Sequence, residues 1–257
     1  MLIVVLILSQ AVYARERLVM IGGGARPDVV MKRYVELAGG NKARVLIVPW
    51  ASEEPQESYE ALRRDLLAAG ASEVFCAPEA PLDEFKKQQL LRQLDNATAV
   101  FFAGGDQRKI MKELDDALYD RFHECYKTGK VFGGTSAGTA IMSEQMITGD
   151  GQFDVIDGDS VQVSKGLGLL PGTIVDQHFI KRMRENRLFG LVLKYRDRLG
   201  LGIDEATALV VYDNKLAEVV GTSYVMVVDA RFRKDALLVY LLKHGQRFDL
   251  RKRKLIN

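Results

Sequence analysis

The first 150 residues alternate between short apolar segments and amphipathic segments, and this alternation is the strongest constraint on the fold. Apolar runs rich in Val, Ile and Phe occur at residues 18–21, 44–48, 73–77, 98–103 and 130–133. Runs of this length predict buried strands. The amphipathic segments at about residues 55–69, 82–94 and 108–127 predict helices between them. A repeated strand–helix–strand order predicts a parallel sheet that is covered on both faces.

The second part of the protein is less regular. Residues 148–168 are polar and glycine-rich, which indicates a long loop or a hairpin. A basic helix is expected at about residues 180–198. Antiparallel strands are then expected at residues 206–212, 216–220, 224–229 and 236–242 and near Phe248. Because no repeat or change of composition divides the sequence, we expect a single catalytic α/β domain over residues 15–257.

The N-terminus has the features of an export signal. Residues 1–14 carry no charge, residues 2–8 are all apolar, and residues 11–14 offer a cleavage site with small residues. We therefore predict a signal peptide at 1–14, although its usual positively charged start is missing. The run is too short to span a bilayer. A secreted or periplasmic protein without stable membrane association after processing is expected. The alternative is a buried first strand in a cytoplasmic protein.

The composition excludes several classes of protein. Lys and Arg number 36 against 34 Asp and Glu, so the net charge of +2 gives no electrostatic basis for nucleic-acid binding. The two cysteines, Cys76 and Cys125, are too few for a disulfide scaffold or a cysteine-built zinc site. An oxidising compartment would permit a bridge between them. The three histidines leave few candidates for a catalytic base.

Residues 130–140 contain a candidate nucleophile. A β run ends in glycines, presents Ser136 and enters a helical segment of small residues. Gly134 and Gly138 flank the serine at the spacing of a nucleophile elbow, whose strained backbone requires small neighbours. Such a turn exposes the hydroxyl and directs the N–H of Ala137 toward an oxyanion. The alternative is a glycine-rich turn with an incidental serine.

A catalytic serine requires a base and an acid that orients it. His178 ends a short β-like run, which is where α/β proteins place site residues, whereas His244 lies in a predicted turn and His123 in a predicted helix. Asp204 and Glu205 both precede a β run, and either could orient the base. A general α/β-hydrolase esterase would use the order Ser, acid, His and would need His244 instead.

Several segments together resemble one known family. They are residues 102–107 (FAGGDQ), 133–138 (GGTSAG), 166–170 (GLGLL), 176–179 (DQHF) with Arg182, Arg184 and Arg187 after them, 202–208 (GIDEATA) and 245–250 (GQRFDL). The pattern is similar to the serine peptidase family that contains cyanophycinases and aspartyl dipeptidases, and it covers nearly all of residues 17–250. The resemblance implies an α/β fold: a parallel-sheet α/β sandwich of the class I glutamine amidotransferase-like type, with antiparallel C-terminal strands.

The resemblance also implies a function. The catalytic residues would be Ser136, His178 and Glu205, which favours Glu205 over Asp204, and Gly105 would join Ala137 in the oxyanion hole. Cyanophycinases hydrolyse cyanophycin, a polyaspartate with arginine on each aspartate side group, to β-Asp-Arg dipeptides through an acyl-enzyme. The implied enzyme is exopeptidase-like, needs no metal or organic cofactor and forms homodimers. An α-aspartyl dipeptidase and a non-catalytic amidotransferase-like binding domain remain alternatives.

The substrate-binding candidates include six polar residues. Residues 181–198 contain seven cations and two acids, and arginine forks suit carboxylates. The resemblance adds polar side chains that would hold a guanidinium or the substrate backbone. The candidates are Gln107, Asp176, Gln177, Arg182, Arg184 and Arg187. Two other features have simpler interpretations. The glycines at residues 22–24 predict a tight turn rather than a phosphate loop, and Thr139 stands where the family usually has alanine.

Overall fold

The computed structural model describes residues 16–152 and 154–256. The predicted signal peptide at residues 1–14 therefore lies outside the described residues.

The main sheet has nine strands in the order β15-β14-β11-β10-β1-β5-β4-β2-β3. Its five parallel strands are β1 (Arg17–Ile21), β2 (Arg44–Val48), β3 (Glu73–Cys76), β4 (Ala99–Phe102) and β5 (Val131–Thr135). Its antiparallel strands are β10 (Thr207–Tyr212), β11 (Leu216–Gly221), β14 (Arg247–Asp249) and β15 (Lys254–Ile256). The predicted parallel sheet with antiparallel C-terminal strands is confirmed.

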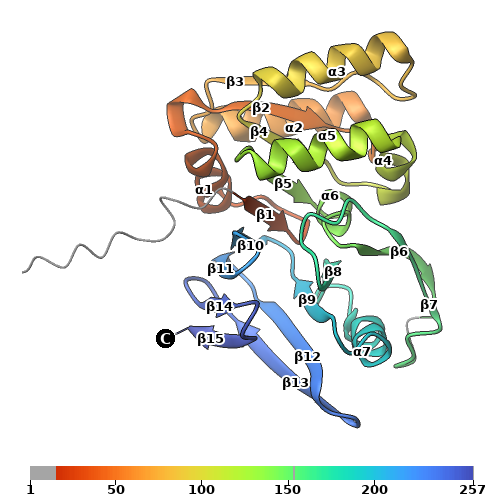
Figure 1. The fold of residues 1–257 in the computed structure, drawn as a ribbon. Helices are drawn as coiled ribbons and strands as arrows, with labels where there is room; N and C mark the ends of the chain where they lie inside the picture. The colour runs from red at the N-terminus through yellow and green to blue at the C-terminus, as the bar shows by residue number, and fades with distance from the viewer. Residues whose placement is uncertain (1–15, 153, 257) are drawn as a thin grey trace, which may run out of the picture.

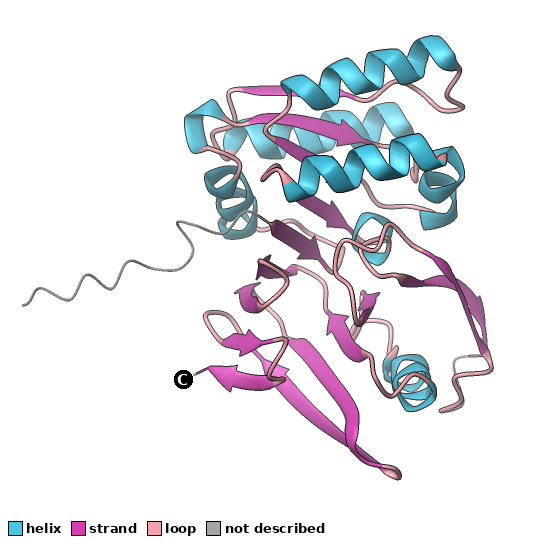
Figure 2. Cartoon of the chain, viewed as in Figure 1, coloured by secondary structure: helices cyan, strands magenta, loops and turns pink. Residues whose placement is uncertain are grey.

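Helices cover both faces of the parallel strands, as Figures 1 and 2 show. Helices α1 (Asp28–Leu37) and α2 (Pro55–Ala68) bury Tyr34 and Leu66 against one face. Helices α3 (Glu84–Asn96), α4 (Gln107–Glu113) and α5 (Asp116–Lys127) cover the other face, where Phe102, Phe122 and Phe132 pack together. The result is the predicted α/β sandwich.

A second sheet follows in the C-terminal part, in the order β13-β12-β9-β8. Its strands are β8 (Thr173–Gln177), β9 (Leu199–Ile203), β12 (Val225–Arg233) and β13 (Ala236–Leu242). Helix α7 (Glu185–Lys194) packs on this sheet through Leu188 and Leu191. The polar segment predicted as a loop or hairpin is a hairpin, formed by β6 (Gln145–Gly151) and β7 (Val161–Lys165).

The structure differs from the predicted elements in three places. The helix expected over residues 108–127 is two helices, because the Asp115 carboxylate accepts a hydrogen bond from the Leu118 N–H and starts a new one. The basic segment is helical only in α7, since residues 181–183 form a turn and Met183 has a φ of 50°. Helix α1, the short 3-10 helix η2 (Gly40–Lys42) and strands β9 and β15 were not predicted.

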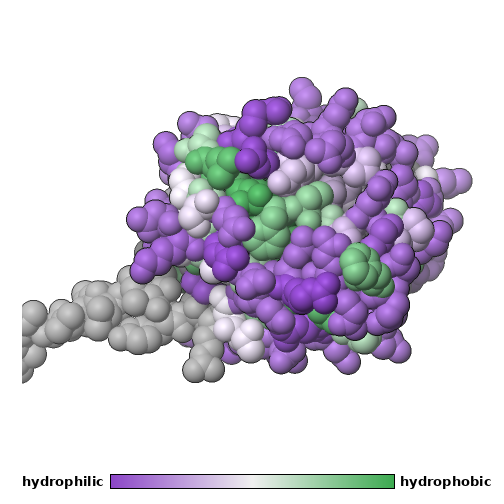
Figure 3. All heavy atoms as spheres, turned by 90° about the horizontal axis from the view of Figure 1, so that it is seen from above, coloured by the Kyte–Doolittle hydropathy of each residue, from purple (hydrophilic) through white to green (hydrophobic). Residues whose placement is uncertain are grey.

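Strand β3 is an edge of the main sheet, with Phe75 and Cys76 half-buried along it. Seen from above, apolar residues gather within a mostly hydrophilic surface on this side of the molecule (Figure 3). Cys76 and Cys125 are both free thiols. No helix in the described part of the protein is long and apolar enough to cross a membrane.

Candidate active site

The two sheets bring four strand ends together. Strand β1 pairs with β5 so that Ile21 lies beside Thr135, and β8 pairs with β9 so that Gln177 lies beside Ile203. The segments that follow these four residues therefore leave their sheets at neighbouring points. A hydrogen bond of 2.6 Å from the His178 N–H to the Gly22 carbonyl joins the end of β8 to the end of β1.

Ser136 lies in the strained turn that the elbow motif predicts. It sits between β5 and the short helix α6 (Ala137–Ala140), with φ 52° and ψ −111°. The turn is tightly packed, because a Cβ on Gly134 would lie 2.3 Å from the Gly138 carbonyl oxygen. A Cβ on Gly138 would lie 2.2 Å from the carbonyl oxygen of Phe102. Both positions therefore require glycine.

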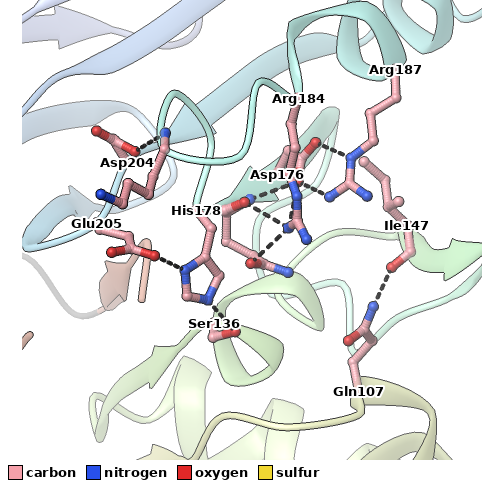
Figure 4. Close-up of polar contacts among 11 residues, drawn as sticks. Gln107, Ser136, Ile147, Asp176, His178, Arg184, Arg187, Asp204 and Glu205 are labelled. Atoms are coloured by element: carbon pink, nitrogen blue, oxygen red, sulfur yellow. Dashed lines mark hydrogen bonds and ion pairs between the residues drawn. The ribbon is translucent and has the colours of Figure 1, made fainter. Parts of the chain in front are cut away.

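Ser136, His178 and Glu205 form a continuous series of polar contacts (Figure 4). The Ser136 Oγ lies 2.9 Å from His178 Nε2, and His178 Nδ1 lies 2.5 Å from Glu205 Oε1. The carboxylate favours a proton on Nδ1, which leaves the Nε2 lone pair to accept the serine hydroxyl. The arrangement is that of a nucleophile, a general base and a group that orients the base.

The surroundings of His178 keep its ring neutral. Burial lowers the pKa of His178 below its ordinary value of 6.5. The positive charges of Arg182 and Arg184 lower this pKa further, against the opposing effect of Glu205. A neutral imidazole is the form that accepts a proton from serine.

The other acids and histidines occupy different environments. The Asp204 carboxylate accepts hydrogen bonds from the Lys181 N–H at 2.9 Å and the Ser223 hydroxyl at 2.6 Å, so it supports the turn after β8. His244 is exposed and accepts a long hydrogen bond from the Gly221 N–H. His123 Nε2 lies 2.7 Å from the Leu167 carbonyl oxygen. Neither of these histidines contacts Ser136, so the arrangement expected of an esterase that uses His244 is absent from the described residues.

The turn after β4 passes beside the serine. A Cβ on Gly104 would lie 3.4 Å from Ser136 Cβ, which places the Gly104–Gly105 backbone next to the nucleophile. Gly105 has a φ of 133°, and a Cβ there would lie 1.9 Å from the Ala51 carbonyl oxygen. Ala137 begins helix α6, so its N–H precedes the first intrahelical hydrogen bonds.

The glycines at residues 22–24 contribute more to the site than the predicted tight turn. A Cβ on Gly23 would lie 2.3 Å from the His178 ring, and one on Gly24 would lie 2.7 Å from the Glu205 carboxylate. The turn thus makes room for the side chains of His178 and Glu205. Sequence reasoning missed this role because it depends on contacts between segments far apart in the sequence.

Four of the candidate substrate-binding residues contact each other in two pairs. Asp176 and Arg187 form a bidentate ion pair, and only 1% and 3% of their side chains are exposed. Arg184 donates to the Gln177 side-group oxygen at 2.9 Å and to the Gln177 carbonyl at 2.8 Å, and burial beside Arg187 lowers the pKa of Arg184 to about 10. Arg182 is exposed.

Gln107 lies across from these arginines in Figure 4, where its side chain donates to the Ile147 carbonyl at 2.6 Å. This contact ties the start of α4 to the β6–β7 hairpin. The hairpin segment, which sequence alone did not place, therefore borders the site.

Two cavities lie near the carboxyl ends of the parallel strands. One, of about 270 Å³, is lined by Ser136, Gly104 and the glycine turn together with Arg26, which sequence analysis did not single out. A larger one, of about 570 Å³, is lined by Trp50, Cys76 and several charged residues, and none of Ser136, His178 and Glu205 borders it. We take the smaller cavity as part of the candidate active site because it contains the nucleophile.

A comparison with protein families matches residues 18–219 to the model of peptidase family S51. The protein belongs to peptidase family S51. It is therefore a serine peptidase by family, in agreement with the series of polar contacts that ends at Ser136.

Curated relatives point in the same direction. The sequence is 34% identical over 223 residues to a cyanophycinase of Synechococcus elongatus, a match that covers 83% of this chain and 68% of the relative. It is 33% identical to the cyanophycinase of Geminocystis herdmanii, covering 92% of this chain and 94% of the relative. It is 31% identical to the cyanophycinase of Trichormus variabilis, covering 95% and 89%.

Solved structures share the fold. A peptidase from an acI-B1 Actinobacterium matches with a TM-score of 0.70 at 21% identity, covering 92% of this chain and 97% of that one. A putative peptidase E from Listeria monocytogenes matches with a TM-score of 0.56 at 14% identity, covering 89% and 99%.

Proposed function

We propose that this peptidase hydrolyses cyanophycin to β-Asp-Arg dipeptides. The observation that carries the proposal is the hydrogen-bonded series of Ser136, His178 and Glu205 beside a set of arginines, in a protein whose curated relatives at 31–34% identity are cyanophycinases. The candidate substrate presents a carboxylate on each of its arginine units. Arginine residues near the nucleophile match that chemistry.

The proposed reaction is acyl transfer in two halves. His178 Nε2 takes the hydroxyl proton of Ser136 while Oγ bonds to the scissile carbonyl carbon. The carbon–nitrogen bond then breaks, and His178 gives the same proton to the departing amine. A water molecule loses a proton to His178 and attacks the ester, and Ser136 regains its proton as the acyl group leaves. Glu205 holds the imidazole in the required tautomer and stabilises its protonated form.

The oxyanion in each half would be bound by the backbone N–H groups of Gly105 and Ala137. The supporting observations are the Gly104–Gly105 turn beside Ser136 and the position of Ala137 at the start of α6. Such donors act without reorganisation and are worth about 3 kcal/mol each in comparable enzymes.

We assign direct substrate contacts to Gln107, Gln177, Arg182 and Arg184. Asp176 and Arg187 are fully buried against each other, so their proposed role is to support Arg184 and Gln177. Removal of Asp176 would take away the carboxylate that pairs with both Arg184 and Arg187, and breaking a buried ion pair of this kind costs about 3–5 kcal/mol. This assignment differs from the expectation that all six residues contact the substrate.

Two further expectations remain proposals about the whole protein. We propose export to a secreted or periplasmic location, because residues 1–14 have the pattern of a signal peptide. We also propose a homodimer, which the family resemblance implies; sedimentation equilibrium of the purified protein tests it.

The test of the proposed function is hydrolysis of purified insoluble cyanophycin, with the products identified by mass spectrometry. We expect β-Asp-Arg dipeptides from the natural protein and none above background from Ser136→Ala. Ser72→Ala is the matched control, because Ser72 precedes β3 at the opposite end of the strands, where its hydroxyl donates to the Ala43 carbonyl. This variant should release dipeptides at the natural rate.

Two results would overturn the proposal. Dipeptide release that persists in Ser136→Ala would show that Ser136 is not the nucleophile. No release from cyanophycin, together with cleavage of aspartyl dipeptides that requires Ser136, would make the protein a dipeptidase of the same family.

A further inference from the structure

We propose that Arg26 binds the free backbone carboxylate at the C-terminus of the substrate, and so selects for cleavage at that end. The inference rests on the proposed function, because it assumes a polymer of β-Asp-Arg units as substrate. It adds a specificity residue on the side of the nucleophile opposite to the arginines of the segment after β8.

Arg26 forms part of the wall of the cavity that contains Ser136. It lies two residues beyond the glycine turn that packs against His178 and Glu205. Its side chain is 23% exposed, so most of it is buried at the cavity wall. A cation held in this way at the wall of a catalytic cavity suits an anionic group of a ligand.

Asp65 on α2 fixes the orientation of Arg26. Its Oδ2 accepts a hydrogen bond of 2.6 Å from Arg26 Nε. Asp65 lines a hollow of about 110 Å³ on the far side of Arg26 and does not line the catalytic cavity, so it holds the guanidinium from behind. Among residues 16–152 and 154–256, the hydrogen bonds found for Arg26 involve Nε alone. The two terminal amino groups are thus left to form the planar fork that matches a carboxylate.

The Arg26 cavity and the other arginines lie on different sides of the catalytic histidine. In Figure 4, Glu205 lies on one side of His178, and Arg184 and Gln107 lie on the other. Gly24 lines the cavity and lies against Glu205, so the cavity opens on the Glu205 side. A substrate that contacts both Arg26 and the arginines after β8 must pass over Ser136 between them.

The size of the cavity limits what fits beyond the scissile bond. Its volume is about 270 Å³, and Ser58, Ala61 and Leu62 of α2 form its far wall. Pockets for drug-sized molecules usually begin at about 300 Å³. This small volume suits a single terminal unit of the substrate.

Charge then decides which end of the substrate enters. An amino terminus would need a negatively charged group at the end of the cavity, whereas Arg26 presents a positive one. The carboxyl-terminal unit is also the part that leaves as the amine when Ser136 attacks a peptide carbonyl. We therefore assign the Arg26 cavity to the leaving unit and the arginine segment after β8 to the acyl unit.

The experiment compares two synthetic oligomers of β-Asp-Arg units that differ only at the C-terminus of the aspartate backbone. One carries the free carboxylate and the other a carboxamide, and both keep every arginine carboxylate. We expect the natural protein to prefer the free acid by about tenfold or more in kcat/KM, since a charged hydrogen bond is lost with the amide. The difference should lie mostly in KM, because the carboxylate is bound equally before and during the reaction.

Arg26→Gln should cleave the free acid no better than the amide, and Arg26→Lys should keep part of the preference. Arg64→Gln is the matched control, because Arg64 is an exposed arginine on the same helix as Asp65. It should keep the full preference. Thermal unfolding and labelling of Ser136 by a fluorophosphonate show whether each variant is folded with an intact nucleophile.

The possible results distinguish the role of Arg26 from the proposed substrate. Equal cleavage of both oligomers by the natural protein, or an unchanged preference in Arg26→Gln, would overturn the role of Arg26 and leave the proposed substrate intact. Cleavage of neither oligomer by a protein whose Ser136 is labelled would reject the proposed substrate and this inference with it. The comparison of oligomers on the natural protein does not depend on the folding of any variant.

Discussion

Three residues at the site have backbone angles that residues other than glycine usually avoid. Ser136, His178 and Ala206 have φ values of 52°, 49° and 54°. Each such residue costs about 1–3 kcal/mol and persists only where its surroundings fix it. Here the fixing contacts include the 2.6 Å bond from the His178 N–H to Gly22 and the 3.0 Å bond from the Ala206 N–H to Gly23. These three residues are the nucleophile, the base and the neighbour of Glu205.

Gly23 offers a test of that arrangement. In Gly23→Ala the new Cβ would lie 2.3 Å from the His178 ring, so the ring must move away from Ser136. We expect kcat/KM to fall by about a hundredfold or more, since a displacement of this size separates the base from the nucleophile. Steady-state kinetics on cyanophycin oligomers measures the loss.

Gly70→Ala is the matched control for Gly23→Ala. Gly70 has a similar φ of 102° but has open space where its Cβ would be. It should lose stability through backbone strain and keep its kcat/KM. Equal losses of activity in the two variants would show that strain, rather than displacement of His178, is responsible.

The charge of Arg182 should be visible in the pH profile. Because burial and the nearby arginines lower the pKa of His178, the acidic limb of kcat/KM should lie below pH 6.5. Removing one positive charge in Arg182→Gln should raise the pKa of His178 and move that limb to higher pH. The shift is read from the midpoint of the limb and is independent of any overall loss of activity.

Lys181→Gln serves as the control for charge, because Lys181 is exposed beside Arg182 but is not among the main causes of the pKa shift of His178. The midpoint of the acidic limb should not change in Lys181→Gln. A midpoint that fails to move in Arg182→Gln, or that moves equally in both variants, would refute the electrostatic explanation.

At the scale of elements, the strongly apolar strands and the serine turn could be predicted from sequence, whereas weaker elements could not. Strand β9 contains Gly200 and Gly202, which weaken a strand signal. The structure explains both, because Cβ atoms there would collide with Val192 of α7 and the Phe179 ring. Helix α1 did carry a signal, since Val30, Met31, Tyr34 and Val35 have helical spacing after Pro27.

The residues of the candidate site also differ in whether the sequence alone predicted them. Ser136 and His178 follow strand ends and could be singled out from the residues around them. Glu205 and Asp204 are adjacent, and only the family resemblance favoured Glu205; the structure places Glu205 against the imidazole. Arg26 had no local signal, because its relation to Ser136 arises from the pairing of β1 with β5 and from its contact with Asp65 of α2.

Thr139 stabilises the turn between β5 and α6. Its buried hydroxyl lies 2.7 Å from the Ile21 carbonyl oxygen and 2.8 Å from that of Gly134, and its one proton is shared between two acceptors. The nearly isosteric Thr139→Val should lower the free energy of unfolding by about 1–2 kcal/mol, because the hydrogen bond is lost in a buried place. Urea denaturation measures the change.

Thr139→Ser keeps the hydroxyl and removes only a methyl group, so it reports the packing contribution alone. A stability of Thr139→Val equal to that of the natural protein would mean that the hydroxyl makes no net contribution.

At the scale of the whole molecule, the candidate site belongs to two sheets. The nucleophile comes from the nine-stranded sheet, while the base and the acid follow strands of the four-stranded sheet. The bond of 2.6 Å from the His178 N–H to the Gly22 carbonyl joins the end of β8 in one sheet to the end of β1 in the other. Catalysis therefore depends on the junction of the sheets as well as on the elbow.

The N-terminus gives a prediction about the mature protein. Expressed in a bacterium with a general secretory pathway, the protein should be exported and cleaved after residue 14, because an apolar run precedes small residues there. Ala14→Leu should block the cleavage, since the processing enzyme requires a small residue at that position. Intact mass and N-terminal sequencing of the exported protein test this. Uncleaved protein confined to the cytoplasm would favour the alternative of a first strand.

The most direct test of the central claim is covalent labelling of the nucleophile. A fluorophosphonate should add to one serine, and peptide mapping by mass spectrometry should place the adduct on Ser136. The adduct should be lost in His178→Ala and retained in His244→Ala, because the His178 Nε2 lies 2.9 Å from the Ser136 Oγ. No adduct on the natural protein, or an adduct on another serine that persists in Ser136→Ala, would contradict the assignment of Ser136 as the nucleophile.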